Sequence, residues 1–309
     1  MKKLLTIAVL SCALSTVAHA DSDDPIKIPI HNWSSQIVGA YIVGKILNEN
    51  GREVEFVPAD SQAVYQSMCE GDIDLVHEVW EGAFGENFEK VVAEGCVVDV
   101  ATHDAKTREE WWYPDYVEEQ CPGLPDWEAL NACAEIFSTP ETAPKGRFLA
   151  GPADWLKNDD KRVKGLGINF EVVNAGQAAA LWAELKSASD AKRPIVLFNW
   201  TPNFVEALYK GKFIEFPEHG EGCTTDPSWG INPNEVYDCG NPKGGYLKIG
   251  VWQGFADKYP EAYKVVQKIN FNNLDVAVMA KLVDIDEMEP EAAAEMWLQE
   301  NAGKWKSWL

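Results

Sequence analysis

The sequence has few basic residues, and this shortage excludes several classes of protein. Its 309 residues contain 27 Lys and Arg against 49 Asp and Glu, which gives a formal net charge of −22. Binding to nucleic acid or to an anionic membrane surface depends on Lys and Arg side chains that neutralise phosphate groups. We therefore expect neither kind of partner.

Long hydrophobic runs are also scarce. Within the first twenty residues a lysine pair precedes an apolar stretch over 4–14, and Ala18-His19-Ala20 follows. This order predicts a cleavable secretory signal peptide over residues 1–20. The alternative is a lipid anchor at Cys12, but the apolar core before that cysteine is very short. No later stretch is apolar enough over a sufficient length to span a bilayer, so we expect a soluble exported protein.

Zinc-binding motifs are missing as well, because the sequence has no C-x-x-C or H-x(3–5)-H spacing. Six cysteines follow residue 20, an even number in a compartment that permits disulfides. Six cysteines allow fifteen pairings in principle. They fall along the chain as three local couples, so we favour structural disulfides with the pairing Cys69–Cys96, Cys121–Cys133 and Cys223–Cys239.

The patterning of the chain indicates an α/β protein with two lobes. About 290 residues remain after the signal peptide, which is more than one hydrophobic core comfortably holds. A strand-helix-strand-helix-strand order over 26–80 predicts a parallel sheet whose ligand-binding edge lies at the carboxyl ends of its strands. A second α/β unit begins after the segment 109–116, with strands expected over 146–151, 171–174 and 194–200.

Tryptophan is unusually abundant, with thirteen in the chain. We expect the three near the C-terminus, Trp297, Trp305 and Trp308, to be packing residues. A single indole at a strand end is most often an amphipathic residue at the margin of a core. Several at one edge instead predict a cage for a methylated ammonium group, which has no N–H to donate and is held by aromatic faces. Six stand in loops or at strand ends on the presumed cleft side: Trp33, Trp80, Trp111, Trp112, Trp155 and Trp200.

Several blocks of the sequence also resemble a known family. They are Asn32-Trp33-Ser34, Gly71-Asp72-Ile73-Asp74 running to Trp80, Gly151-Pro152-Ala153-Asp154-Trp155, Trp200-Thr201-Pro202, and the C-terminal segment 297–308. Together they resemble the glycine betaine/choline-type substrate-binding proteins of ABC transporters over nearly the whole mature chain. The resemblance implies a type II periplasmic binding protein fold, two lobes that close over a ligand, and a membrane permease as partner.

The resemblance further implies a domain division and a set of binding residues. We expect one discontinuous lobe over 21–110 and 212–309, a second lobe over 111–211, a periplasmic location and a monomer. Trp80, Trp155 and Trp200 match the ammonium-cage aromatics, and Trp33 and Trp112 match further aromatics of the choline-binding branch. Which of Trp111, Trp112, Tyr113 and Tyr116 faces the ligand stays open, because neighbours on an extended segment point in opposite directions.

The ligand is not fixed by the sequence. Family members often carry an acid two residues after the first tryptophan and a histidine shortly after Trp-Thr-Pro, whereas this chain has Ser35 and Asn203-Phe204. Glu78 shares a strand face with Trp80, so we expect it in the binding site. An ionised acid there favours a cation such as choline, and a protonated acid could donate to an N-oxide. Trimethylamine N-oxide, glycine betaine and choline are therefore all candidates.

Other functions are less well supported. An exported carbohydrate-active enzyme could use tryptophan platforms with Glu78 and Glu81, but adjacent carboxylates poorly suit an opposed acid and base. His31 and His77 have no nucleophile motif beside them, so we expect no catalysis. An adhesion module would need a large exposed apolar patch. No cofactor is expected, although the oxygen-rich segment between Cys223 and Cys239 offers possible calcium ligands in Asp226, Asn232 and Glu235.

Overall fold

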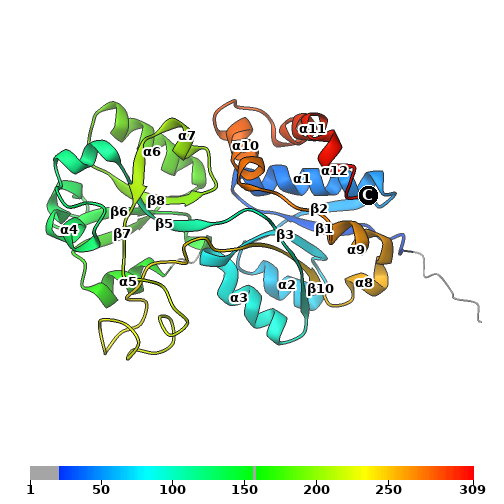
Figure 1. The fold of residues 1–309 in the computed structure, drawn as a ribbon, viewed down its shortest axis with the longest axis horizontal. Helices are drawn as coiled ribbons and strands as arrows, with labels where there is room; N and C mark the ends of the chain where they lie inside the picture. Colours follow the sequence, from blue (N-terminus) through cyan, green and yellow to red (C-terminus); the bar gives the residue numbers. More distant parts are fainter. Residues whose placement is uncertain (1–20, 156–157) are drawn as a thin grey trace, which may run out of the picture.

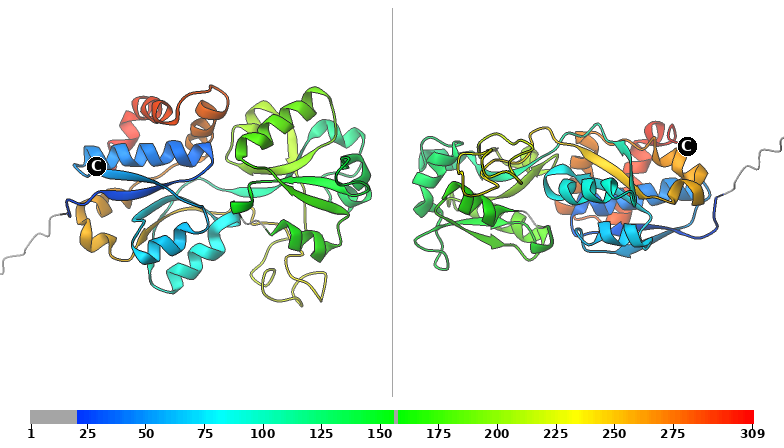
Figure 2. Two further views of the ribbon diagram at one scale, coloured as in Figure 1. Left: turned by 180° about the vertical axis from the view of Figure 1, so that it is seen from behind. Right: turned by 90° about the horizontal axis from the view of Figure 1, so that it is seen from below.

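The computed structural model describes residues 21–155 and 158–309, which form two α/β lobes lying side by side (Figure 1, Figure 2). The predicted signal peptide, residues 1–20, lies outside the described residues. In the part of the chain that is described, no helix combines the length and the apolar character needed to cross a membrane.

The first lobe contains two small sheets. A parallel pair consists of β1 (Ile26–Ile30) and β2 (Val54–Pro58). A three-stranded antiparallel sheet has β10 (Leu247–Trp252) in the centre, between β3 (Leu75–Trp80) and β4 (Val97–Thr102). The local pattern predicted a parallel sheet that included β3, but β3 pairs with β10 instead. β1 and β3 remain adjacent, since the backbone N–H of Lys27 donates to the Asp74 carboxylate at 2.8 Å.

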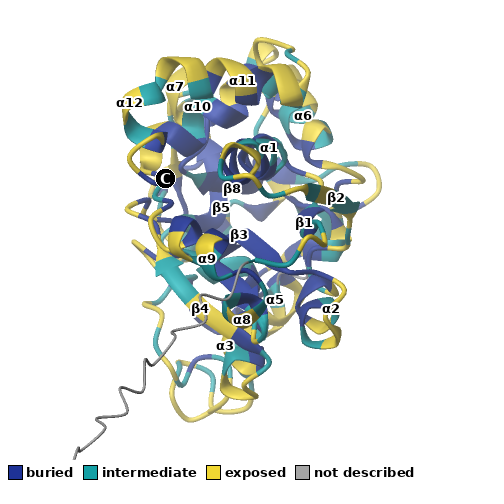
Figure 3. Cartoon of the chain, turned by 90° about the vertical axis from the view of Figure 1, so that its right-hand side faces the viewer, coloured by how far each residue is buried: buried dark blue, intermediate teal, exposed yellow. Residues whose placement is uncertain are grey.

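Helices pack on these sheets and bury β3 throughout, whereas β2 and β4 keep exposed residues (Figure 3). α1 (Ser34–Glu49) packs against α10 (Asn273–Asp284) and α11 (Pro290–Glu300). The remaining helices of this lobe are α2 (Val64–Glu70), α3 (Glu81–Ala93), α8 (Phe255–Lys258), α9 (Pro260–Val266) and α12 (Ala302–Trp305). Trp297 and Trp308 pack edge-on against Phe271, with ring centroids 5.6 and 5.7 Å from it, so their predicted packing role is confirmed.

The second lobe is built on one five-stranded sheet with the order β7-β6-β8-β5-β9. β6 (Gly146–Ala150) runs parallel to β7 (Phe170–Asn174) and β8 (Val196–Thr201). β5 (Arg108–Pro114) runs antiparallel to β8 and to β9 (Gly211–Phe213). Its helices are α4 (Trp127–Ala132), α5 (Asp159–Leu166), α6 (Ala178–Asp190) and α7 (Val205–Leu208).

The chain crosses between the lobes twice, and the two crossing segments pair with each other. Thr107 and Gly245 exchange backbone hydrogen bonds of 2.9 and 2.8 Å. Loop 214–241 packs on the second lobe, where the Asn232 amide donates to the Gly165 carbonyl at 2.8 Å. The boundaries between the lobes therefore differ from the predicted division into 21–110 with 212–309 and 111–211. The second lobe already begins with β5 at Arg108, and the chain returns to the first lobe only after loop 214–241.

The structure contains three disulfides, each within one lobe: Cys69–Cys96, Cys121–Cys133 and Cys223–Cys239. The first joins the end of α2 to the start of β4. The third closes loop 223–239 on the second lobe. This is the pairing that the order of cysteines along the chain favoured.

Candidate ligand-binding site

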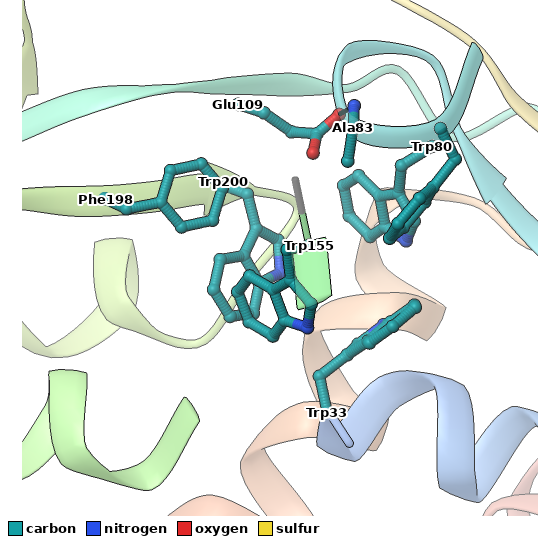
Figure 4. Close-up of a pocket in the computed structure, with 8 residues that line it drawn as sticks. Trp33, Trp80, Ala83, Glu109, Trp155, Phe198 and Trp200 are labelled. Atoms are coloured by element: carbon teal, nitrogen blue, oxygen red, sulfur yellow. Dashed lines mark hydrogen bonds between the residues drawn. The ribbon is translucent and has the colours of Figure 1, made fainter. Parts of the chain in front are cut away.

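A small cavity lies between the two lobes, and tryptophans form most of its wall (Figure 4). Its unfilled space, including space open to solvent, is about 250 Å³. The described lining residues are Trp33, Trp80, Ala83, Phe84, Glu109, Trp155, Phe198 and Trp200.

Each lobe contributes two indoles, and each indole lies at a strand end, just before a helix, or in the short segment that follows a strand. Trp33 immediately precedes α1, and Trp80 ends β3 directly before α3. Trp155 ends a short 3-10 helix after β6, and Trp200 lies near the end of β8. All four are between 3 and 6% exposed. Strand ends of the two lobes thus meet at one site, as their sequence positions predicted.

The rings stand at steep angles to one another. Trp155 lies at 83° to Trp33 and at 82° to Trp200, with centroid distances of 5.8 and 5.4 Å. Because neighbouring walls are nearly perpendicular, more than one aromatic face is available to a group placed in the corner between them. Aromatic faces within about 6 Å attract a desolvated cation. The arrangement suits a cationic or dipolar head group without N–H donors.

Glu78 lies behind the indoles and is not among the residues that line the cavity. Its Oε1 accepts hydrogen bonds from Trp33 Nε1 at 2.8 Å, Trp80 Nε1 at 2.7 Å and Ser35 Oγ at 2.8 Å. Burial raises the pKa of this carboxyl, and the three donors oppose that rise. The carboxylate therefore contacts the cage walls, whereas the sequence predicted a contact with the ligand, which stays a prediction.

Glu109 is the carboxylate that lines the cavity, and sequence reasoning missed it. It lies in β5 directly opposite Trp200 of β8, is 4% exposed, and points toward the space between the indoles (Figure 4). Its Oε2 accepts a hydrogen bond of 3.1 Å from the backbone N–H of Ala83, in the first turn of α3. Only the register between β5 and β8 identifies it. No local signal marks it out from its neighbour Glu110.

Phe84 and Phe198 were also missed. Phe198 could have been found, because it precedes Trp200 by two residues and alternation places both on one face of β8. The two rings lie 5.6 Å apart at 28°. Phe84 stacks on Trp33 at 5.6 Å and 16°.

Trp112, which the resemblance placed in the site, lies elsewhere. It is buried in the second lobe between the partners Leu197 and Phe213, and its ring fills the space beside Gly211. Trp111 stacks on Phe148 at 3.8 Å. Neither is among the described lining residues. The side chains of Tyr113 and Tyr116 bond instead to Glu118 and to the carbonyl of Arg193.

Direct hydrogen bonds connect the lobes next to the cage. The Asn32 amide accepts from Trp155 Nε1 at 2.7 Å and donates to the Asp154 carboxylate at 2.9 Å. Gln62 Nε2 donates to the Trp155 carbonyl at 3.2 Å. These contacts join the first lobe to the loop that carries one cage tryptophan.

The predicted calcium ligands do not converge on one point. Asp226 accepts from Ser228, the Asn232 amide donates to the Gly165 carbonyl, and Glu235 pairs with Lys164 at 2.8 Å. Groups of three or more His, Cys, Asp or Glu ligand atoms within 4.8 Å do occur among the described residues. They are His219 with Cys223 and Cys239, and Glu94 with Cys69 and Cys96, and their cysteines are disulfide-bonded.

The carboxylates proposed for glycoside hydrolysis do not face each other across the cavity. Glu81 Oε2 accepts from the backbone N–H of Tyr246 at 3.0 Å, at the crossing between the lobes, while Glu78 is bound by indoles. His31 Nδ1 lies 2.9 Å from the Ala59 carbonyl. Burial lowers the pKa of His77 to about 3, so it is neutral at physiological pH.

Two α/β lobes joined by paired crossings, with an enclosed aromatic site between them, define a substrate-binding protein of the periplasmic type. The OpuAC family, the substrate binding domain of ABC-type glycine betaine transport systems, matches residues 24–300. The chain belongs to this family.

Individual relatives agree with the family assignment. A trimethylamine N-oxide-binding protein from Pelagibacter ubique is 44% identical over 310 residues, covering 97% of this chain and 95% of the relative. A choline-binding protein in complex with choline has a similar fold, with a TM-score of 0.71 and 20% identity over 92% of this chain and 91% of the other. The ProX protein of Borrelia burgdorferi also has a similar fold, with a TM-score of 0.74 and 17% identity. The match covers 93% of this chain and 97% of the other.

These findings settle the class of protein. The two-lobed α/β prediction is confirmed, and the chain is a substrate-binding protein of an ABC transporter, not an enzyme. Such a protein works outside the cytoplasm and with a membrane permease.

Proposed function

We propose that the protein captures trimethylamine N-oxide, or a closely related methylated ammonium compound without a carboxylate, in the tryptophan cage. It does so as a monomer in the periplasm, after export by the predicted signal peptide, and delivers the ligand to its permease. The observation that carries the proposal is the composition of the cage: four indoles and one carboxylate. Each aromatic face contributes about 0.5–2 kcal/mol, so four indoles together contribute up to about 8 kcal/mol before ordering costs, and burial of the methyl groups adds to this.

Glu109 favours ligands that lack an anionic end. Lys, Arg and His do not occur among the described residues that line the cavity. The carboxylate of glycine betaine would therefore meet the acid Glu109 in a cavity whose described lining contains no basic side chain. Trimethylamine N-oxide and choline have no carboxylate to place beside this acid. The Pelagibacter relative, which is named for trimethylamine N-oxide, supports the same ligand.

Calorimetry tests this proposal. The mature protein and Glu109→Gln are titrated with trimethylamine N-oxide, choline and glycine betaine. We expect the wild type to bind the N-oxide most tightly. Glu109→Gln offers a side-chain N–H donor and removes the acid, so N-oxide binding persists, while betaine binding improves. Absence of binding of all three ligands to the wild type would refute the proposal.

A further inference from the structure

We propose that Glu78 is a positioning and specificity-determining residue that acts through Trp33 and Trp80 and makes the cage selective for positive charge. The inference rests on the proposed function, since it concerns how the cage recognises a methylated ammonium group. Glu78 is separated from the ligand by the two indoles that it holds.

The geometry at Oε1 fixes the orientation of both rings. An indole N–H is a donor only, so Trp33 and Trp80 each need an acceptor once they are buried. Both find it in one oxygen atom, at 2.8 and 2.7 Å, and Ser35 Oγ approaches the same atom at 2.8 Å. The indoles of Trp33 and Trp80, which precede different helices, are thereby hydrogen-bonded to the same oxygen atom on β3.

The negative charge of this carboxylate is not compensated by a cation. Among the described residues, no Lys or Arg lies within ion-pair distance of Glu78. The basic side chain nearest to it in the ion-pair geometry is His77, whose Nε2 lies 3.8 Å from Oε2. His77 is neutral, because burial lowers its pKa to about 3. The field of an ionised Glu78 therefore reaches the cavity.

The field of Glu78 also offsets the positive potential of two helix N-termini at the cage. α1 begins directly after Trp33 and α3 directly after Trp80, so two helix N-termini lie at the cage. A helix N-terminus carries a partial positive charge, which disfavours a bound cation. Glu78 lies beside both helix starts and offsets that charge from behind the indoles, as Glu109 does from the cavity side through Ala83.

The test compares Glu78→Gln with Ser35→Ala. Glutamine keeps the volume and leaves Oε1 to accept from both indoles, but it removes the charge. Ser35→Ala removes one donor from the same oxygen and keeps the charge. The probes are tetramethylammonium and tert-butanol, a cation and a neutral molecule of similar shape, both measured by competition with trimethylamine N-oxide.

We expect Glu78→Gln to weaken tetramethylammonium binding about tenfold or more, because it removes a negative charge that lies behind two cage indoles in a partly polar medium. Tert-butanol binding should be unchanged, and Ser35→Ala should change both probes less than threefold. Equal losses for the two probes, or no loss for the cation, would overturn the inference. When tert-butanol binds the wild type too weakly to measure, nuclear Overhauser contacts between the rings of Trp33 and Trp155 decide instead. A tenfold loss for the cation with these contacts retained supports the electrostatic role, and loss of the contacts refutes it.

The same experiment separates two kinds of failure. A wild-type protein that binds no methylated ammonium compound contradicts the proposed function. A wild type that binds them, with Glu78→Gln indistinguishable from it, contradicts only the role of Glu78.

Discussion

The hydrogen bonds of Asn32 give a prediction about lobe closure. Asn32 belongs to the first lobe, and its amide bonds to both Trp155 and Asp154 of the second, at 2.7 and 2.9 Å. It does not line the cavity. Asn32→Ala therefore removes two contacts between the lobes, one of them to the N–H of a cage indole, and removes no described lining residue. We expect the closed state to lose stability relative to the open state, and every ligand that requires closure to bind more weakly.

The magnitude follows from the two hydrogen bonds. A neutral bond contributes about 1 kcal/mol and one to a carboxylate about 1.5–3 kcal/mol, but Asn32 is exposed, which reduces both. A total of about 2 kcal/mol corresponds to roughly thirtyfold in Kd. Calorimetry gives the Kd, and stopped-flow tryptophan fluorescence should place most of the change in the dissociation rate.

A matched control is Asn48→Ala, at an exposed asparagine near the end of α1, the helix that follows Asn32. It should leave the Kd unchanged. The reasoning also requires that Asn32→Ala weakens choline and trimethylamine N-oxide by the same factor, because the lost contacts belong to closure and not to the ligand. A change below twofold, or a change confined to one ligand, would refute it.

Three further predictions concern the cage, a buried acid and a disulfide. Trp200→Ala should weaken binding of trimethylamine N-oxide by about 2 kcal/mol in calorimetry, whereas Trp229→Ala, at a 40% exposed indole outside the cavity, should not change it. Burial raises the pKa of Asp284 to about 6, so ionisation of this carboxyl destabilises the folded state. The stability that the protonated carboxyl contributes is fully present below its unfolded-state pKa near 3.8 and is lost as the pH rises through about 6. Asp284→Asn should therefore raise the free energy of unfolding at pH 8 by up to about 3 kcal/mol and not at pH 4, and equal effects at both pH values in denaturant titrations would contradict this. Replacing Cys121 and Cys133 by alanine opens a link with a sequence separation of 12, and calorimetric unfolding should show a loss of about 3 kcal/mol with the Kd unchanged.

The sequence by itself determined the class of fold and most of the cage. Trp33, Trp80, Trp155 and Trp200 could be predicted because each stands at a strand end, just before a helix, or in the turn that follows a strand, and such positions meet at the ligand edge of α/β lobes. Alternation along β3 also placed Glu78 beside Trp80. These are properties of neighbouring residues, so a single sequence carries them.

Only the tertiary structure decided which groups complete the site. Glu109 enters the cavity because β5 pairs with β8 in a register that sets it opposite Trp200, and no local pattern encodes that register. The same pairing of β5 with β8 places Trp112 inside the second lobe. Glu78 holds the indoles because the start of α1 brings Trp33 and Ser35 to its Oε1 from more than forty residues away in the chain. Pairings between distant segments depend on how the whole chain packs, and they determine where the charges lie around the four tryptophans.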